Sequence, residues 1–343
     1  MELNKKLLVL LPYLFLLIAT YIIQALFFAP VKNIEAKLFT INKGEAVKEI
    51  AFNLKRGNLI KDPYVFIAYI AITGKYSKVQ AGDYLLSSQM SAYNIINILI
   101  NGETAKETIT IIEGWDLRDL NDYLEKIEIS TNDDFFNLTG IPTEIKKNQN
   151  VEDLSKKFSF LKDKPANLSL EGYLFPDTYY IDKGDDAKTL IEKALSNFDS
   201  KLSQELRDEI KKQKKTIFEI ITMASMIEKE VKTLNDKKIV SGILWKRIEN
   251  GMRLQVDATV LYATGKGNSK VYTKDTQFDS PYNTYRYDGL PVGPISNPGI
   301  DSIVAAIYPT KTNNLYYLST PDGKTIFSKT LEEHNYNKNK YLK

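Results

Sequence analysis

Cysteine is absent from the 343 residues of this sequence, and histidine occurs only once, at His334. Without cysteine there is no thiolate nucleophile, no disulfide framework and no cysteine-containing zinc site. A Ser-His-Asp triad could use only His334, and a metal site would consist almost entirely of carboxylates, which magnesium and calcium prefer. We therefore expect acid–base chemistry from Asp, Glu, Lys or Tyr side chains, with neither a metal nor another cofactor.

An excess of charge of either sign is also missing. The chain has 46 Lys and Arg against 43 Asp and Glu, a net charge of +3, so its overall charge gives no support for a nucleic-acid partner. Hydrophobic residues make up 43% and charged residues 26%, which is ordinary for a folded protein. The length suggests about two domains.

The N-terminus carries a stretch without charge over residues 7–29. As a helix rising about 1.5 Å per residue it would be about 34 Å long, enough to cross a bilayer. It is longer than a signal-peptide core of about 7–15 residues and no clear A-x-A site follows, so we favour an uncleaved anchor over a cleaved signal or a buried core helix. Because only residues 1–6 precede it, we place this short tail in the cytoplasm and the bulk of the protein outside.

Beyond the anchor, the pattern predicts a compact module over residues 38–104 and a larger region over 105–343. Expected in the module are strands at 38–41 and 84–86 and helices that begin near residues 47, 63 and 92. Expected in the larger region are a strand at 108–112, loops and short helices over 129–168, helical stretches at 189–211 and 217–231, and a hairpin of 315–319 with 325–327. The mixture indicates the α+β class.

One glutamate stands out on the helix predicted to begin at residue 217, after the capping box formed by Thr216 and Glu219. Steps of about 100° per residue place Glu228 in the apolar stripe of this helix and Glu230 about 200° away. Loss of hydration among aliphatic neighbours would raise the pKa of Glu228, which suits a general acid working near neutral pH. The alternative is that Glu228 emerges into water and pairs with Lys232.

Other polar residues follow on stretches expected to be extended or rigid. After the turn residue Gly251, polar and apolar residues alternate and include Gln255 and Asp257. Asn283 and Tyr285 belong to the first of two proline-containing loops, residues 281–285 and 289–294. Amide and phenol side chains on stiff loops suit carbohydrate, because hydroxyl groups need paired donors and acceptors and sugar faces stack on rings. The alternative is that the tyrosines only pack a loop-rich core.

Several ordered motifs give the sequence a strong family resemblance. They are residues 111–115, 170–179, 224–230, 254–257, 282–285, 289–299 and 333–335. In this order they resemble the endolytic murein transglycosylases of the MltG, or YceG-like, family. The module at 38–104 resembles a LysM-like domain, which implies binding of glycans that contain N-acetylglucosamine.

The resemblance implies a single-pass protein of the bacterial inner membrane, held in the lipid bilayer by residues 7–29, with a periplasmic catalytic domain. It would cut nascent peptidoglycan strands between N-acetylmuramic acid and N-acetylglucosamine, leave 1,6-anhydro ends, and terminate elongation beside a membrane-bound peptidoglycan synthase, a penicillin-binding protein. The family's catalytic glutamate is expected at Glu228. Substrate-binding or supporting roles are expected for Gln255, Asp257, Asn283, Tyr285 and Glu230, the last as a surface or supporting residue.

Two other functions stay open on the sequence. A glycoside hydrolase would pair Glu228 with a second acid, for which Asp257 is the best candidate, because such enzymes usually need two carboxylates. A scaffold that binds the cell wall without catalysis would need neither. We expect His334, near the C-terminus, to pack or to form hydrogen bonds and not to act as a base.

Overall fold

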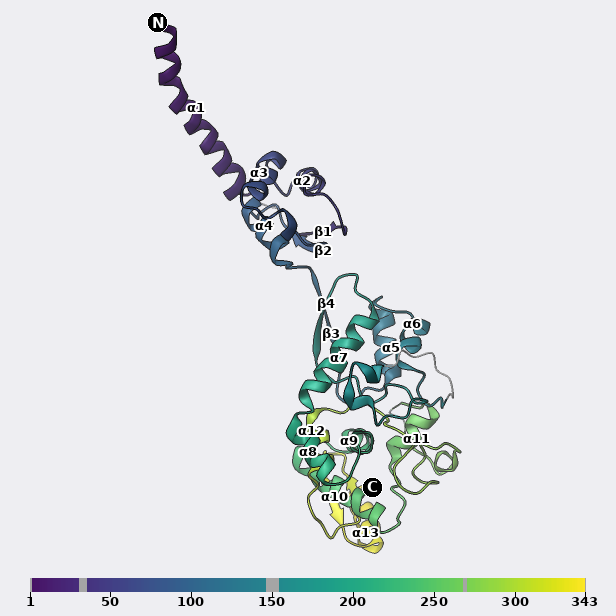
Figure 1. The fold of residues 1–343 in the computed structure, drawn as a ribbon. Helices are drawn as coiled ribbons and strands as arrows, with labels where there is room; N and C mark the ends of the chain where they lie inside the picture. Colours follow the sequence, from purple (N-terminus) through teal and green to yellow (C-terminus); the bar gives the residue numbers. More distant parts are fainter. Residues whose placement is uncertain (1, 31–35, 146–153, 268–269, 343) are drawn as a thin grey trace. The chain divides into compact units, whose positions relative to one another are not determined.

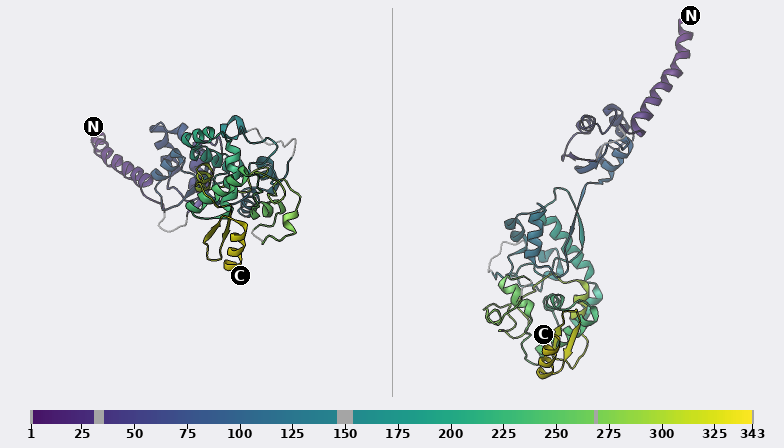
Figure 2. Two further views of the ribbon diagram at one scale, coloured as in Figure 1. Left: turned by 90° about the horizontal axis from the view of Figure 1, so that it is seen from below. Right: turned by 180° about the vertical axis from the view of Figure 1, so that it is seen from behind.

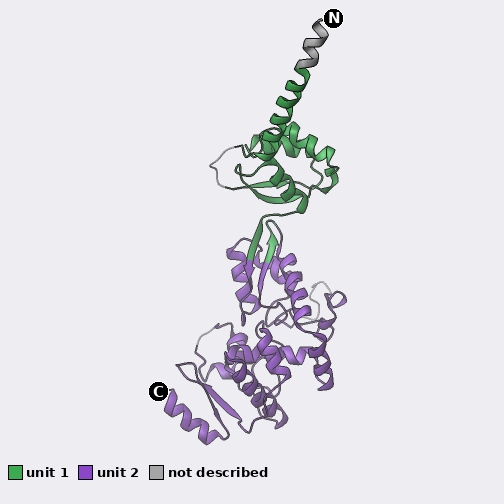
Figure 3. Cartoon of the chain, turned by 90° about the vertical axis from the view of Figure 1, so that its left-hand side faces the viewer, with its two compact units in different colours: residues 1–108, 180–184 green, residues 109–179, 185–343 purple. Residues whose placement is uncertain are grey.

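The computed structural model describes residues 2–30, 36–145, 154–267 and 270–342 (Figure 1). The chain separates into two compact units (Figure 3). The first comprises residues 1–108 with 180–184, and the second comprises 109–179 with 185–343. Helices and two-stranded sheets make up the described part of the chain, so the predicted α+β class is confirmed.

The first unit begins with helix α1 (Glu2–Phe27). Its window Leu10–Phe27 has a mean hydropathy of 2.1 and is long and apolar enough to cross a membrane, which is consistent with the predicted anchor. Most of its described apolar side chains are exposed, as on a helix that is not a core element of a folded unit. Of the residues around the predicted anchor, Met1 and residues 31–35 lie outside the described part of the chain.

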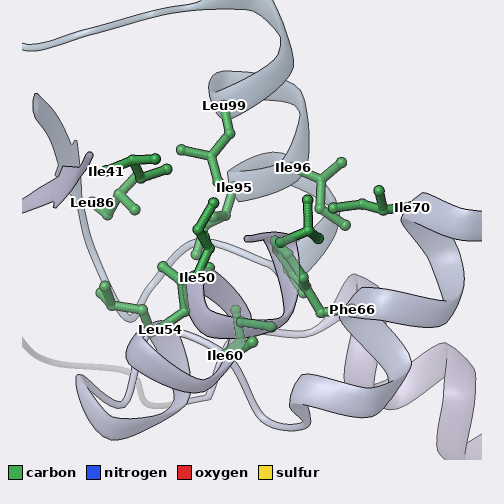
Figure 4. Packing of buried hydrophobic residues seen from close by; sticks show 14 of the residues in the cluster. Ile41, Ile50, Leu54, Ile60, Phe66, Ile70, Leu86, Ile95, Ile96 and Leu99 are labelled. Carbon is green, nitrogen blue, oxygen red and sulfur yellow. The ribbon is translucent and has the colours of Figure 1, made fainter. Parts of the chain in front are cut away.

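The rest of the first unit is a small sheet covered by helices. Strand β1 (Lys37–Ile41) pairs antiparallel with β2 (Gly82–Leu86), with Phe39 opposite Tyr84. The helices are α2 (Val47–Arg56), α3 (Pro63–Ile72) and α4 (Ala92–Asn101), with a short 3₁₀ turn η1 at Tyr76–Lys78. Figure 4 shows how aliphatic side chains from these helices and both strands meet in one core, as the predicted periodicity requires.

The ends of these helices follow from local chemistry. The Asp62 side chain accepts hydrogen bonds from the first backbone N–H groups of α3, and Pro63 occupies the first helical position. Ser91 caps α4 in the same way, and Gly102 ends that helix with a φ of 68°, a conformation that glycine adopts without strain. All the elements predicted between residues 38 and 104 are present in the structure.

The second unit surrounds one buried helix. Strands β3 (Lys106–Thr110) and β4 (Thr178–Asp182) each have residues in both units. The N-terminal half of the second unit contains α5 (Leu117–Lys126), α6 (Asn132–Thr139), η2 (Leu154–Lys156), η3 (Ser159–Leu161), α7 (Ala187–Lys201) and α8 (Gln204–Lys212). The helical stretch predicted over 189–211 is in fact two helices, because the chain leaves the helix at Leu202 and Ser203 caps α8. Part of the predicted loop stretch, residues 146–153, lies outside the described residues.

The C-terminal half of this unit holds α9 (Ile217–Glu230), α10 (Leu234–Glu249), α11 (Asp257–Thr264), η4 (Asp275–Gln277), α12 (Ile300–Ile307), β5 (Tyr316–Ser319), β6 (Thr325–Ser328) and α13 (Leu331–Tyr341). The predicted capping box is present, and every residue from Ile220 to Ile227 is buried. Figure 1 shows α9 end-on, with α11 on one side and α8 and α12 on the other. The β5–β6 hairpin and α13, coloured yellow, lie together (Figure 2).

One glycine permits a close approach in this half. A Cβ atom at Gly242 of α10 would lie 2.0 Å from the backbone oxygen of Thr310. No side chain fits there, so glycine allows α10 to pack directly against the segment that follows α12.

Candidate active site

A cleft of about 750 Å³ opens in the second unit where α9 ends. Its walls come from the last residue of α9, the start of α11, β5 and α13, together with loop residues between them. Residues that line it include Glu230, Arg247, Gln255, Asp257, Lys270, Tyr285, Tyr316, Tyr317, His334, Asn335 and Lys338. Carboxyl, amide and phenol groups are therefore gathered in one hollow, and the volume is typical of a site for a small molecule or a few sugar units.

Glu230, the last residue of α9, places its carboxyl group in the wall of this cleft. Burial raises its pKa to about 7; a hydrogen bond from the Tyr317 phenol opposes the rise, and the nearby charge of Asp257 adds to it. A carboxyl group that holds its proton near neutral pH can act as a general acid. Glu230 itself is half-buried at the wall of the cleft, and Met223 and Met226 on the same side of the helix are buried.

Asp257 and Tyr285 form a hydrogen-bonded pair beside Glu230. The phenol of Tyr285 donates to Oδ1 of Asp257 at 2.5 Å. Burial, followed by this bond to Asp257, holds the pKa of Tyr285 well above its usual value. The pair therefore presents a fixed carboxylate edge and a protonated phenol to the cleft.

Gln255 has a backbone conformation that is rare for its residue type. Its φ is +54°, in the left-handed region, and its N–H donates to the backbone oxygen of Thr284 at 3.1 Å. The segment predicted to be extended thus makes a sharp turn just before α11 begins at Asp257. Such strained residues concentrate at functional sites, and this one places an amide on the wall of the cleft.

Glu228 lies in a different environment, and it is not among the described residues that line the cleft. Its side chain is 8% exposed and pairs with Lys237, 4% exposed, through Oε1 and Nζ at 3.0 Å. Its Oε2 accepts hydrogen bonds from the N–H of Gly299 at 2.9 Å and the hydroxyl of Ser302 at 2.7 Å. Both carboxylate oxygens are therefore held by the protein.

The position of Glu228 explains these contacts. Gly299 is the N-cap residue of α12 and has no side chain to satisfy the free N–H groups there. The carboxylate of Glu228 accepts the N–H of Gly299 itself, and its negative charge lies at the positive end of the helix. The Glu228 side chain is little exposed, but its neighbours are polar and not aliphatic, and its partner is Lys237 and not Lys232.

Asn283 supports the site from behind. It is fully buried, and its side-chain amide donates to the backbone oxygens of Thr276 at 3.1 Å and Phe278 at 2.7 Å. Its Oδ1 accepts from the N–H of Tyr285 at 2.9 Å. These bonds use both ends of the amide to fix the loop that carries Tyr285, and Asn283 is not among the described residues that line the cleft.

Arg247 and Tyr317 are residues of the cleft that the sequence patterns do not identify. Arg247, buried in α10, donates to the backbone oxygens of Leu254 at 2.6 Å and Leu315 at 2.8 Å. It thereby ties the turn before Gln255 to the strand that carries Tyr317. Alternation in the predicted hairpin marks a strand but does not say which of its tyrosines meets a carboxyl group.

His334 lies at the edge of the cleft. Its ring stacks on Tyr316, with centroids 5.4 Å apart, and the Arg247 guanidinium lies 4.9 Å from the centre of the same tyrosine ring. Burial, followed by the charges of Lys338 and Arg247, lowers the pKa of His334. Among the described residues there is no group of three or more His, Cys, Asp or Glu side chains placed to hold a metal ion.

A second buried carboxyl group lies away from the cleft. Glu171 accepts hydrogen bonds from the N–H of Leu117 at 3.1 Å and from the phenol of Tyr262 at 3.0 Å. Burial is the main reason that its pKa rises to about 8. Because it joins the start of α5 to α11, it belongs to the scaffold that carries Asp257.

Comparison with known proteins gives a consistent family. The model of the YceG-like family matches residues 39–340. A Bacillus subtilis protein named endolytic murein transglycosylase is 36% identical over 310 residues, which cover 88% of this chain and 84% of that protein. A protein of the same name from Streptococcus pneumoniae serotype 2 is 32% identical over 318 residues, covering 87% of this chain and 57% of its own length.

A solved structure agrees with these relatives. The crystal structure of a yceG-like protein from Listeria monocytogenes is 34% identical, with a TM-score of 0.59, and the match covers 89% of this chain and 100% of that one. The match of the family model over most of the chain, together with these relatives, establishes that the chain belongs to the YceG-like family.

Proposed function

We propose that this protein is a membrane-anchored endolytic murein transglycosylase in which Glu230 acts first as acid and then as base. One observation carries the assignment: Glu230 lines a cleft of about 750 Å³ and has its pKa raised to about 7. The names of the relatives in Bacillus and Streptococcus support the reaction class.

The reaction needs only one carboxyl group. Protonated Glu230 donates its proton to the oxygen that links N-acetylmuramic acid to N-acetylglucosamine, and the bond from C1 of the muramic residue to this oxygen breaks. The carboxylate then removes the proton of the C6 hydroxyl of the same muramic residue, whose oxygen bonds to C1. The product is a 1,6-anhydro ring, and no water is consumed. Because the nucleophile is already part of the substrate, its effective concentration is high.

The neighbours of Glu230 fit this chemistry. The carboxylate of Asp257, fixed by the Tyr285 phenol at 2.5 Å, can stabilise positive charge that develops at C1. The Gln255 amide is placed to meet sugar hydroxyls on the cleft wall. Glu228, which the family resemblance suggested as the acid, is proposed instead to hold α9 and α12 in place through its bonds to Lys237 and Ser302.

The proposed location follows from α1. We place its N-terminus in the cytoplasm and the second unit on the outer side of the bacterial inner membrane, where nascent glycan strands are made. The module at 38–104 would position glycans that contain N-acetylglucosamine, as a LysM-like domain does. A membrane-bound peptidoglycan synthase, a penicillin-binding protein, is the proposed partner.

The test is the variant Glu230→Gln, purified in full length and given isolated glycan strands. General acid–base catalysis contributes about 10²–10⁴-fold, so the release of anhydro-ended fragments, followed by mass spectrometry, should fall by at least about 100-fold. The matched control, Glu205→Gln, alters an exposed carboxylate on α8 and should keep the full rate. Activity of Glu230→Gln equal to that of the control would overturn the assignment.

A hydrolase is the second candidate, because Asp257 lines the same cleft as Glu230 and could activate a water molecule. The two mechanisms differ in their products. In water enriched in ¹⁸O, hydrolysis gives reducing ends that carry the label, whereas transglycosylation gives unlabelled anhydro ends. Labelled reducing ends as the main product would replace the proposed reaction with hydrolysis.

A further inference from the structure

Helix α3 in the first unit is apolar on the side that faces outward. Its exposed residues, at helical spacings of four, seven and eight, are Tyr64, Ala68, Ala71 and Ile72. Tyr64 is 68% exposed and Ile72 is 85% exposed. No charged residue occurs from 63 to 74. A helix in contact with water normally presents polar residues on its outer stripe, so this stripe is not built for water.

The core of the unit does not account for this stripe. The inward side of α3 supplies Pro63, Phe66 and Ile70 to the core, and Figure 4 shows Phe66 and Ile70 directed into the cluster. Phe52 of α2 packs edge-on against Tyr64, with ring centroids 5.6 Å apart, which supports this tyrosine from one side and leaves it exposed. The outward stripe therefore has apolar surface left over after the core is complete.

The anchor helix packs against the same part of the unit. The phenol of Tyr21 in α1 donates to Oδ2 of Asp62, the N-cap of α3, at 2.5 Å. The Lys61 ammonium donates to the backbone oxygen of Gln24 at 3.3 Å. Leu26 of α1 is 5% exposed and belongs to the core cluster of the unit. The start of α3 is thus fixed against the end of α1.

These contacts set the depth of α3. Tyr21 lies six residues before Phe27, the end of the apolar window, which is about 9 Å along a helix. If α1 crosses a bilayer, Asp62 and the first turn of α3 lie where the bilayer meets water. The aromatic contacts agree, because the Phe27 ring lies 5.3 Å from Tyr93, which lies 6.0 Å from Tyr69 of α3. Tyrosines are enriched at this depth.

Lysines flank both ends of the apolar stripe. Lys55 and Lys61 lie at its start, and Lys75 and Lys78 follow its end. Two of these side chains lie over aromatic rings, with Lys61 Nζ 5.9 Å from the centre of Phe28 and Lys75 Nζ 5.8 Å from that of Tyr69. Long cationic side chains beside tyrosines can reach lipid phosphates while their stems stay in apolar surroundings.

We propose that the outward stripe of α3 is a membrane-binding surface, buried in the headgroup region of the leaflet in which α1 ends. The occupant is lipid with anionic headgroups, drawn by the flanking lysines. The inference goes beyond the proposed reaction and rests on the proposed anchoring by α1. The first unit would then contact the membrane at two places, through the anchor helix α1 and through the outward stripe of α3.

The absence of cysteine makes the test direct. Single cysteines are introduced into the full-length protein at Ile72, at Phe15 in α1, and at Glu103. Glu103 is exposed and follows the C-terminal end of α4, whereas Tyr93, which contacts α1, lies at the start of that helix. Each is labelled with a polarity-sensitive fluorophore in vesicles of phosphatidylethanolamine and phosphatidylglycerol. With Ile72→Cys we expect a blue-shifted emission and quenching by spin-labelled lipid at least threefold stronger than with Glu103→Cys.

The three positions separate the possible outcomes. If the labels at positions 15 and 72 are both quenched by lipid, the inference is supported. If the label at position 15 is quenched and the label at position 72 behaves like that at position 103, the anchoring by α1 is supported and the inference about α3 fails. The stripe would then be a surface for a protein partner, which stays in water when the vesicles lack that partner. If position 15 is also in water, the proposed anchoring fails and the inference fails with it. Ile72 is 85% exposed, so its replacement leaves the core unchanged.

Discussion

The ion pair of Glu228 and Lys237 gives the sharpest prediction about which glutamate works on substrate. Replacement of Lys237 by methionine keeps most of the length of the side chain and removes its charge. Glu228, with a side chain 8% exposed, then keeps only the bonds from Gly299 and Ser302. Removal of one partner from a buried pair costs about 3–5 kcal/mol, and because two hydrogen bonds remain we expect about 3 kcal/mol. The variant Glu228→Gln removes the negative charge opposite the buried Lys237 ammonium and should cost a similar amount.

The assay is thermal and urea-induced unfolding of the full-length chain in detergent. For a unit of 150–250 residues, 1 kcal/mol moves the Tm by about 2–4 °C, so each single variant should unfold about 6–12 °C below the parent. The double variant Glu228→Gln, Lys237→Met replaces the charged pair with a neutral one and should recover most of this loss. The interaction energy from the four proteins measures the pair directly.

Two results would refute this reasoning. If Glu228→Gln unfolds with the parent and yet loses its activity on glycan strands, Glu228 acts on substrate and is not a structural residue. If the double variant is as unstable as the sum of the single variants, the two side chains do not depend on each other. With the expected outcome, each variant keeps an activity in proportion to its folded fraction.

Two further predictions concern pH. The rate of glycan cleavage should fall as pH rises through the pKa of Glu230, about 7, because the acid must be protonated. Asp257→Asn removes a negative charge that raises this pKa, so the fall in rate should move to lower pH. Tyr317→Phe removes a hydrogen bond that lowers this pKa, so the fall should move to higher pH. Rate profiles that do not move in either variant would contradict the assignment. Folded Glu171, with a pKa of about 8, keeps a proton that the unfolded chain loses above about pH 4.5, so this group should lower the free energy of unfolding by about 1.4 kcal/mol per pH unit between these values, in addition to the fall that Glu230 causes up to about pH 7. Glu171→Gln should therefore make the fall between pH 5 and 8 shallower in urea titrations, and an unchanged slope would place the titration elsewhere.

The elements that could be predicted are those encoded by neighbouring residues. The capping box of Thr216 and Glu219 begins α9 where expected, and the alternation and turn residues of the C-terminal hairpin give β5 and β6. The break between α7 and α8 was missed because the helical periodicity continues across Ser203, whose role as a cap depends on a local bend. Hydrophobic periodicity thus locates helical stretches, whereas a break inside such a stretch depends on a cap that periodicity does not reveal.

The kinds of side chain at the site could be predicted from the sequence, but not which of them meet in the cleft. Of the expected residues, Gln255, Asp257, Tyr285 and Glu230 line one cleft, whereas Asn283 and Glu228 lie outside its wall. A helical wheel ranks residues by distance from an apolar stripe, and this fails for α9, which is buried on every side from Ile220 to Ile227. On such a helix, the surroundings of each carboxyl group depend on residues that are distant in the sequence.

The two glutamates show how strongly those distant residues act. Glu228 and Glu230 are two positions apart, yet the first meets the Lys237 ammonium and the N-terminus of α12, groups that fix a carboxylate in one place. The second meets the Tyr317 phenol and the negative charge of Asp257 in a buried setting that raises its pKa to about 7. An acid that must give up a proton and take one back is favoured by the second environment, because three of the roughly four acceptor sites on the Glu228 carboxylate already receive hydrogen bonds from Lys237, Gly299 and Ser302. The proposed assignment of Glu230 therefore rests on where each carboxyl group can exchange a proton, and the role proposed for the pair Glu228–Lys237 is to hold α9 in place.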